Sequence, residues 1–322
     1  MPKENPREVS GRPVEYSVVV PVYRSAASLS ELHQRLTRVL AGMSANYEII
    51  FVEDCGGDGS WDIIEQTARS DARVRGLRLS RNFGQHNALL CGIREARGNV
   101  IITLDDDLQN PPEEIPALIK KLSEGFDVVY GRPDKEQHGL FRNLASQITK
   151  IVLKGAMGVE TARGVSTFRV FRAHLRQAFD DYRGSFVSID VLLTWGTKSF
   201  AAIRVAHHAR HAGRSNYTVR ALMTHAVNML TGFSVLPLQL ASVIGFVFTI
   251  FGLGVLVYVL AAYLILGGVV QGFAFLASII AIFSGAQLFA LGIIGEYLAR
   301  MHFKVMEKPS YVVRAHAGSR KA

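Results

Sequence analysis

Cysteine is scarce in this chain of 322 residues, which contains only Cys55 and Cys91. The two lie far apart and form no Cys-x-x-Cys pair, so the sequence supports neither a disulfide framework nor a cysteine-rich zinc site. A secretory signal is also missing, because residues 1–15 are polar and lack an apolar core. We therefore expect a flexible N-terminus over residues 1–15 and a main domain that stays in the cytosol.

Charged side chains are absent from one long stretch. Residues 221–295 contain no Asp, Glu, Lys or Arg, and His225 is the only side chain there that titrates near neutral pH. Within this stretch, Leu240–Leu266 and Val269–Ile294 are each longer than the roughly 20 apolar residues that cross a bilayer. The sequence therefore predicts a transmembrane hairpin of two helices over residues 236–298.

The turn of this hairpin is short, because only Gly267-Gly268 separates the two apolar segments. A turn of that length cannot carry a domain, so both flanks are expected on the same side of the membrane. Basic residues follow the second span, and the positive-inside rule places both flanks, including a basic tail over residues 299–322, on the cytoplasmic face. These residues are Arg300, Lys304, Lys308, Arg314, Arg320 and Lys321.

Nucleic-acid motifs are absent as well, although the net charge is +9. Basic residues beside membrane spans are explained by anionic lipid, so no nucleic-acid partner is predicted. Apolar residues at helical spacing over 139–154 predict an amphipathic helix that either faces the core or lies at the membrane interface. A second such helix is expected over residues 217–235, where the position before the first span favours the interface.

The N-terminal half alternates between two patterns. The β-branched run Tyr16–Val22 is followed by apolar residues at helical spacing, and this pattern of a strand before a helix recurs at Tyr47–Val52, Val74–Leu79 and Val100–Leu104. This alternation predicts an α/β domain with a mostly parallel sheet covered on both faces. The first strand is not followed by Gly-x-Gly-x-x-Gly, which argues against a hydride-transfer enzyme.

Three consecutive aspartates, Asp105–Asp107, follow the fourth predicted strand and precede a helix that starts at Pro111-Pro112. In open α/β sheets ligands bind at the carboxyl ends of the strands, where aspartate oxygens suit Mg²⁺ or Mn²⁺ bridging a diphosphate. The alternative is an acidic turn in which Asp107 or Asn110 caps the helix. An isolated Asp-x-Asp motif does not decide between the two.

Four ordered motifs occur together: SVVVPVY, EIIFVEDCGGDGS, RNFGQHNAL and LDDDLQNPPEE, followed by the two spans. In this combination the chain resembles glycosyltransferase family 2 from about Tyr16 to Tyr311. More narrowly, it is similar to the polyprenyl-phosphate sugar transferases, above all the bacterial undecaprenyl-phosphate enzymes. Dolichol-phosphate mannose synthases are more distant relatives. The resemblance implies a GT-A catalytic domain over residues 16–216.

The resemblance also implies an activity. Family members transfer a sugar, with inversion, from a nucleotide-sugar donor to a polyprenyl phosphate. Here a UDP-sugar and undecaprenyl phosphate are expected, at the cytoplasmic face of the bacterial inner membrane. The product would be a lipid-linked monosaccharide for cell-envelope glycan or lipid A modification. Relatives further suggest a homotetramer.

The implied metal site consists of Asp105, Asp107 and Gln109, which would hold Mg²⁺ or Mn²⁺ against the donor diphosphate. Asp106 stands where relatives usually have alanine, and we expect it to face water. The implied nucleotide-binding residues come from four of the motifs. They are Pro21, Val22, Tyr23, Glu53, Asp54, Asn82, Gly84, Gln85 and Asp105.

The resemblance places phosphate-binding groups downstream. Arg132, Arg142 and Ser146 match positions that bind the phosphates of donor and acceptor, and guanidinium is suited to that task. Without the motif, each arginine would read as a solvated surface charge. A later segment resembling His-x-x-Arg-x-x-Gly-x-Ser-Lys-Tyr adds further acceptor-binding candidates. These are His207, Arg210, Ser215 and Tyr217.

Three departures from the family pattern stand out. Arg24-Ser25 replaces the usual Asn-Glu, Asn216 replaces a lysine, and residues 161–168 lack an aspartate that relatives carry as the candidate base. A missing base is compatible with turnover, because a phosphate monoester with a second pKa of about 6 is already anionic at neutral pH. Two alternatives remain: a processive polysaccharide synthase, whose Gln-x-x-Arg-Trp motif is not found, and a non-catalytic membrane scaffold.

Overall fold

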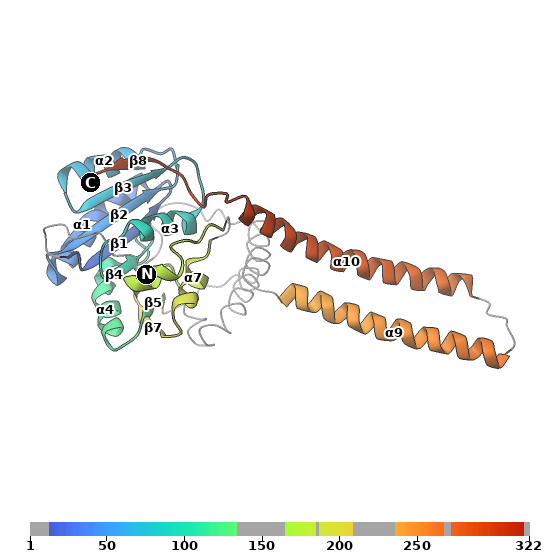
Figure 1. The fold of residues 1–322 in the computed structure, drawn as a ribbon. Helices are drawn as coiled ribbons and strands as arrows, with labels where there is room; N and C mark the ends of the chain where they lie inside the picture. Colours follow the sequence, from blue (N-terminus) through green and yellow to red (C-terminus); the bar gives the residue numbers. More distant parts are fainter. Residues whose placement is uncertain (1–12, 134–164, 185–186, 209–235, 267–271, 319–322) are drawn as a thin grey trace, which may run out of the picture. The chain divides into compact units, whose positions relative to one another are not determined.

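A computed structural model describes residues 13–133, 165–184, 187–208, 236–266 and 272–318. These residues form two units, a sheet with its covering helices and a pair of long helices (Figure 1). The strands are β1 (Tyr16–Val22), β2 (Tyr47–Glu53), β3 (Val74–Leu79), β4 (Val100–Thr103), β5 (Val128–Pro133), β6 (Arg169–Arg172), β7 (Phe200–Val205) and β8 (Val313–Ala317). The α-helices are α1 (Ala26–Met43), α2 (Ser60–Ser70), α3 (Gln85–Glu95), α4 (Ile115–Ser123), α7 (Ile189–Gly196), α9 (Leu236–Leu266) and α10 (Phe273–Val305). Two 3₁₀ turns complete the set, η1 (Pro112–Glu114) and η2 (Ala173–Ala178).

The described strands form one sheet in the order β7-β5-β6-β4-β1-β2-β3-β8. Strands β1 to β4 run parallel, whereas β6 and β8 run antiparallel to their neighbours. Because β5 is antiparallel to β6, it runs in the direction of β4. The carboxyl ends of β1, β2, β4 and β5 therefore meet at one edge of the sheet. This arrangement confirms the predicted α/β class with a mostly parallel sheet.

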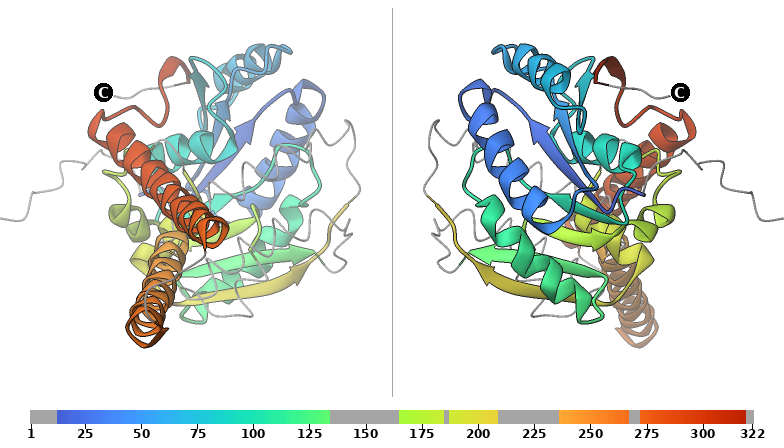
Figure 2. Two further views of the ribbon diagram at one scale, coloured as in Figure 1. Left: turned by 90° about the vertical axis from the view of Figure 1, so that its right-hand side faces the viewer. Right: turned by 90° about the vertical axis from the view of Figure 1, so that its left-hand side faces the viewer.

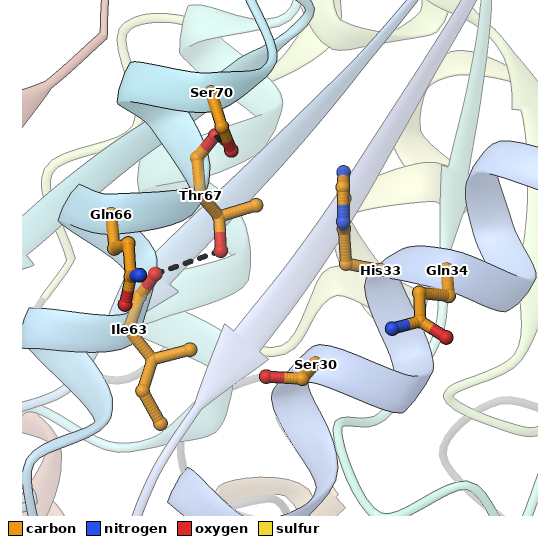
Figure 3. A pocket seen from close by; sticks show the side chains of 7 residues that line it. All are labelled: Ser30, His33, Gln34, Ile63, Gln66, Thr67 and Ser70. Carbon is orange, nitrogen blue, oxygen red and sulfur yellow. Dashed lines mark hydrogen bonds between the residues drawn. The ribbon is translucent and has the colours of Figure 1, made fainter.

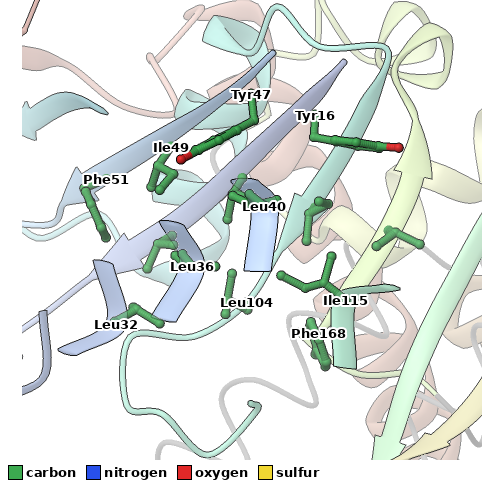
Figure 4. Close-up of a cluster of buried hydrophobic side chains, with 14 of the residues drawn as sticks. Tyr16, Leu32, Leu36, Leu40, Tyr47, Ile49, Phe51, Leu104, Ile115 and Phe168 are labelled. Carbon is green, nitrogen blue, oxygen red and sulfur yellow. The ribbon is translucent and has the colours of Figure 1, made fainter. Parts of the chain in front are cut away.

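Helices cover both faces of the sheet (Figure 2). Helix α1 buries Leu29, Leu32, Leu36 and Leu40, the leucines whose helical spacing is visible in the sequence. They pack with apolar side chains of β1, β2 and α4 in one large cluster (Figure 4). On the opposite face α3 lies so close to the sheet that a Cβ added at Gly92 would come within 2.4 Å of Val19 Cγ1. The large core thus holds β1, β2 and β4 rigidly beneath their carboxyl ends.

Helices α9 and α10 form the second unit, and both are long and apolar enough to cross a membrane. Their apolar side chains are exposed rather than packed in a core, with Phe246 and Leu288 each 68% exposed. A helix with apolar residues on all sides and no protein around it is typical of a lipid environment. The two helices correspond to the predicted spans, although α10 continues to Val305, beyond the expected limit of residue 298. The predicted turn at Gly267-Gly268 and the helices expected over 139–154 and 217–235 lie outside the described residues.

The C-terminal segment, expected as a basic tail over residues 299–322, contains a strand of the sheet. After α10 the chain returns to the sheet, where β8 pairs antiparallel with β3. Ser310 is buried and donates a hydrogen bond to the carbonyl of Gly184 at 2.9 Å. The sequence analysis did not identify this strand, because the segment is only five residues long and two of its three apolar residues are alanines, which have a low preference for strands.

Removal of residues 309–322 is expected to destabilise the sheet domain, because it leaves β3 as an open edge. Four register pairs between β3 and β8 would be lost, which at ~0.2–1 kcal/mol each amounts to about 1–4 kcal/mol. The melting temperature of the full chain in detergent measures this loss. Removal of residues 319–322 alone leaves β8 intact and should leave the melting temperature unchanged. Equal melting temperatures for both truncations would contradict a structural role for β8.

Candidate active site at the carboxyl edge of the sheet

The aspartate loop begins directly after β4. Leu108 lies in this loop with a φ of 60°, and its buried side chain anchors the loop to the core. Asp107 Oδ1 accepts a hydrogen bond from the backbone N–H of Gln109 at 3.1 Å, which closes a local turn. Neither Asp107 nor Asn110 caps the following helix, since η1 starts after Pro111 without a side-chain cap. The helix-cap alternative for this acidic run is therefore wrong.

Asp105 is held by two side chains from different elements. Its Oδ1 accepts a hydrogen bond from Gln85 Nε2 at 2.6 Å, and its Oδ2 accepts one from Thr167 Oγ1 at 2.6 Å. The pKa of Asp105 is raised to about 6, first of all by burial; the hydrogen bond from Thr167 lowers this pKa, and the negative charges of Asp107 and Asp106 raise it. This carboxyl group is thus positioned rigidly in a surrounding where a cation would offset the crowded negative charge.

Asp106 does not face water as expected. Its carboxylate accepts a hydrogen bond from the backbone N–H of Tyr23 at 2.9 Å, and its carbonyl accepts one from Ser28 Oγ at 2.6 Å. The side chain therefore ties the aspartate loop to the end of β1. An aspartate oxygen fits here because the N–H of Tyr23 lies beyond the last residue of β1, where it needs an acceptor.

The donor atoms of this loop fit a hard divalent cation. Asp105 and Asp107 supply carboxylate oxygens, and Gln109, which is partly exposed, carries an amide oxygen. Within the described residues no group of three or more His, Cys, Asp and Glu side chains could hold a metal ion, so the two carboxylates and the amide form an incomplete set of ligands. Such an incomplete oxygen set is typical of Mg²⁺ sites in which water and substrate phosphates fill the other positions.

The end of β1 provides one wall of the site. Pro21 and Val22 are buried in the sheet, whereas the Tyr23 side chain is 42% exposed. Arg24 has a φ of 57°, its guanidinium lies 5.2 Å from the Tyr23 ring centroid, and its Nε donates to the carbonyl of Gly56 at 3.2 Å. The unusual Arg24 thus joins the loops after β1 and β2 and presents a cationic and aromatic surface.

Glu53 and Asp54 organise loops at this edge. Glu53 Oε1 accepts from the N–H of Gly56 at 2.6 Å, and its Oε2 lies 3.1 Å from Nε of Arg78. Asp54 accepts two backbone hydrogen bonds of 2.7 Å, from the N–H groups of Phe83 and Gly84. Burial raises the pKa of Asp54, and these two bonds lower it in part. Both carboxylates already have protein partners, whereas their expected contact with a nucleotide base stays a prediction.

The loop after β3 carries the remaining nucleotide-binding candidates. Asn82 is exposed, and Gly84 precedes α3 with a φ of 93°, a value that favours glycine. Gln85 is the first residue of α3 and contacts Asp105. The structure therefore brings this loop, through Asp54 and Gln85, into the same site as the aspartate loop.

Two of the predicted phosphate-binding residues are described. Arg132 is near the end of β5, partly exposed, at the same edge of the sheet as the aspartates. His207 Nδ1 lies 3.4 Å from Asn110 Oδ1, and the N–H of His208 donates to the carbonyl of Gln109 at 2.9 Å. Chain segment 206–208 therefore lies against the aspartate loop. The other candidates, Arg142, Ser146, Arg210, Ser215 and Tyr217, lie outside the described residues and stay predictions.

A polar network beneath the aspartates was missed by the sequence analysis. It contains Thr103, Tyr130, Thr167, Arg169 and Asp190, which come from three strands, a loop and α7. A signal for it exists in the sequence, since Arg169 interrupts the apolar run from Phe168 to Phe171. An arginine flanked on both sides by apolar residues indicates a buried charge with specific partners.

A cavity of about 250 Å³ lies elsewhere, between α1 and α2 (Figure 3). His33 at its wall already pairs with Asp71 at 3.3 Å. The cavity faces these two helices rather than the carboxyl-end loops, so it is not part of the candidate active site. Its lining residues are Ser30, His33, Gln34, Ile63, Gln66, Thr67 and Ser70.

Comparison with known proteins agrees with the geometry. The family model described as Glycosyl transferase family 2 matches residues 17–183. Undecaprenyl-phosphate 4-deoxy-4-formamido-L-arabinose transferase of Photorhabdus laumondii is 34% identical over 308 residues, 95% of each chain. The protein of the same name from Shewanella sediminis is 36% identical, over 92% of this chain and 91% of its own. The similarity thus covers the sheet domain and both long helices.

Among solved structures, glucosyl-3-phosphoglycerate synthase from Mycobacterium tuberculosis, in complex with Mn²⁺, UDP and glucosyl-3-phosphoglycerate, superposes with a TM-score of 0.51. The two are 15% identical, and the match covers 68% of this chain and 78% of the synthase. Mannosyl-3-phosphoglycerate synthase from Rubrobacter xylanophilus gives a TM-score of 0.50 at 15% identity, covering 67% and 72% of the two chains. At this identity the likeness concerns the fold, and it agrees with the expected GT-A class.

Proposed function

Because the chain belongs to glycosyl transferase family 2 and is a glycosyltransferase, we propose that it transfers a sugar from a nucleotide-sugar donor to undecaprenyl phosphate. The product is a lipid-linked monosaccharide. The observation that carries this proposal is the Asp105 carboxylate, held by Gln85 and Thr167 beside the loops that end β1, β2 and β3. Relatives named as undecaprenyl-phosphate transferases, similar over nearly the whole chain, support the acceptor.

The donor diphosphate is assigned to the carboxyl edge of the sheet. Asp105, Asp107 and Gln109 would hold a Mg²⁺ or Mn²⁺ ion, which when bound neutralises negative charge on the departing nucleoside diphosphate. Tyr23 and Arg24 face the same edge and offer a ring and a guanidinium to the nucleotide. The solved synthase structure of similar fold contains Mn²⁺ and UDP, and this supports a UDP-sugar as the donor.

The acceptor phosphate needs positioning rather than deprotonation. Its second pKa of about 6 leaves it largely anionic at neutral pH, so no general base has to remove a proton. Arg132, at the end of β5, can orient a phosphate with its guanidinium. Attack on the anomeric carbon from the side opposite the nucleotide gives inversion in a single displacement. The site can therefore be active although it lacks the aspartate that relatives carry before the position of Phe168.

The connectivity of the chain supports a membrane topology with both flanks on one side. Strand β7, which precedes α9 in the sequence, and strand β8, which follows α10, belong to the same sheet. If α9 and α10 both cross the bilayer, the chain must return to the side that it left. We assign this side to the cytoplasm of a bacterium, where nucleotide sugars are made and where the basic residues around Arg300 favour retention.

The proposal is tested by acceptor dependence. Full-length protein in vesicles is supplied with radiolabelled UDP-sugars and Mn²⁺, with either undecaprenyl phosphate or undecaprenol in the bilayer. Label is expected in the lipid extract only with the phosphate, because undecaprenol lacks the anionic nucleophile. Equal labelling of both lipids, or label in a water-soluble polymer instead, would contradict the proposal.

Asp54→Asn is expected to weaken donor binding. An asparagine can accept from only one of the N–H groups of Phe83 and Gly84, and the other is left unpaired at a cost of about 1–3 kcal/mol. The loop that carries Gln85 then shifts, and KM for the nucleotide sugar should rise by about 10-fold. The matched control is Asp62→Asn, at an exposed position of α2. An unchanged KM in Asp54→Asn would show that the loop does not depend on this carboxylate.

A further inference from the structure

Arg169 is a fully buried arginine in the middle of the sheet, at 0% exposure. In the strand register it lies between Thr103 of β4 and Tyr130 of β5. Residues paired in this way project to the same face of a sheet and contact each other. Arg169 therefore connects the strand that ends in the aspartate loop with the strand that carries Arg132.

The guanidinium of Arg169 has partners on two sides. Its Nη1 forms an ion pair with Asp190 of α7, whose carboxylate also accepts a hydrogen bond from Tyr130 Oη at 3.0 Å. On the other side its Nε donates to Thr103 Oγ1 at 3.0 Å. The Nη2 atom is buried and has no hydrogen-bond partner in the described part of the chain.

A directed chain of hydrogen bonds continues from Thr103 to the metal-binding loop. The single proton of the Thr103 hydroxyl is donated to the carbonyl of Thr167 at 2.7 Å, so its lone pair is free to accept from Arg169. The Thr167 hydroxyl is then donated to Asp105 Oδ2 at 2.6 Å. Thr103 thus fixes the backbone of Thr167, and the side chain of Thr167 fixes Asp105.

We propose that Arg169 is a positioning residue, which acts through Thr103 and Thr167 to hold Asp105 in the orientation that binds the divalent cation. The proposal deepens the proposed function and rests on the metal site of that function. Fixing the orientation of a metal ligand is the usual task of groups behind a metal site.

Stability alone does not account for this arginine. Replacing a buried ion pair with uncharged residues of similar size is often neutral or even stabilising, because two charges no longer have to be removed from water. In addition, Nη2 is buried without a hydrogen-bond partner among the described residues, which does not favour folding. The arrangement is explained if the guanidinium holds Asp105 in its orientation rather than stabilising the core.

Thr167→Val tests the proposal, because valine keeps the shape of threonine and removes only the hydroxyl. Binding of Mn²⁺ alone to the full chain in detergent is followed by the electron paramagnetic resonance of the free ion, without donor or acceptor. We expect the dissociation constant to rise by about 10–100-fold in Thr167→Val and to return to within about 2-fold of the original in Thr167→Ser. Thr194→Val removes a hydroxyl that bonds within α7 and should leave Mn²⁺ binding unchanged.

The double variant Arg169→Met with Asp190→Asn tests the end of the hydrogen-bond chain that is farthest from Asp105. It removes both buried charges and still leaves Tyr130 an acceptor, so folding is expected to survive. Weaker Mn²⁺ binding by the folded variant would support the proposal. Unchanged Mn²⁺ binding in Thr167→Val, or in the folded double variant, would overturn it. The Mn²⁺-binding measurement uses no lipid acceptor, so a failure of the proposed lipid transfer would not be mistaken for either outcome.

Discussion

Asp107→Asn is expected to lower sugar transfer by about 10²–10³-fold, because a neutral amide is a much weaker ligand for a divalent cation. Charge stabilisation by a metal ion is worth several kcal/mol in the transition state, and each ~1.4 kcal/mol changes the rate tenfold. Folding should be little affected. The Asp107 carboxylate accepts a hydrogen bond from the N–H of Gln109, and the amide oxygen of asparagine can accept the same bond.

The neighbouring Asp106→Asn is the matched control for this prediction. Asp106 accepts a hydrogen bond from the N–H of Tyr23, which an asparagine oxygen can replace, so activity should stay within about 10-fold of the original. Initial rates at saturating Mn²⁺ and a range of donor concentrations measure both variants. If Asp106→Asn lost as much activity as Asp107→Asn, the assignment of metal ligands within the acidic run would be wrong.

Glu48→Ala is expected to have the largest effect on stability. Glu48 is buried at the amino end of β2, where its Oε1 accepts from Ser17 Oγ at 2.7 Å and from the N–H of Arg97 at 2.6 Å. Its Oε2 accepts from Arg75 Nη1 at 3.2 Å. Without Glu48, Arg75 keeps Glu95 as an ion-pair partner at 2.9 Å. The Ser17 hydroxyl and the N–H of Arg97 lose this acceptor, at a cost of about 1–3 kcal/mol each. We expect the melting temperature of the full chain to fall by about 4–20 °C, at about 2–4 °C for each kcal/mol.

Glu31→Ala provides the comparison, because Glu31 forms an exposed pair with Arg35 one helical turn away. Such pairs contribute about 0.3–0.5 kcal/mol, so its melting temperature should hardly change. At temperatures where Glu48→Ala is folded, its kcat should equal that of the original protein, since Glu48 is at the edge of the sheet opposite the active site. Equal melting temperatures for the two variants would contradict the account of this ion-pair network.

Local patterns in the sequence were sufficient for most of the sheet domain. The β-branched run that forms β1 has the predicted bounds, because it is a short apolar segment buried on both faces. Strand β3 also has the predicted bounds. The leucines of α1 likewise identify its buried face. The alternation of β and α elements predicted that neighbouring strands are mostly parallel. It did not predict the order of the strands in the sheet.

Long-range pairing was beyond the reach of these patterns. Strand β8 follows a membrane-type helix and pairs with β3, more than two hundred residues earlier in the sequence. Its residues become a strand because the open edge of β3 accepts them, not because of strong local preference. The same holds for Ser310, which is buried through its contact with Gly184.

The sequence predicted which residues form the candidate site better than it predicted their contacts. Asp105 and Asp107 were identified by their motif, and the structure places both at the expected edge of the sheet. The contact of Gln85 with Asp105 could not be read from the sequence, since it joins two loops that follow different strands. Asp106 was misjudged for a similar reason, because its partner, the N–H of Tyr23, is a backbone group of another strand.

Mass spectrometry of the lipid product tests the central claim most directly. Full-length protein is incubated with undecaprenyl phosphate, Mg²⁺ and a mixture of UDP- and GDP-sugars, and the lipid extract is compared with that of Asp107→Asn. The account predicts one new lipid, whose mass equals undecaprenyl phosphate plus a single sugar residue and which is absent from the variant. Lipids carrying chains of several sugars, or no new lipid while the nucleotide sugar is consumed, would contradict it.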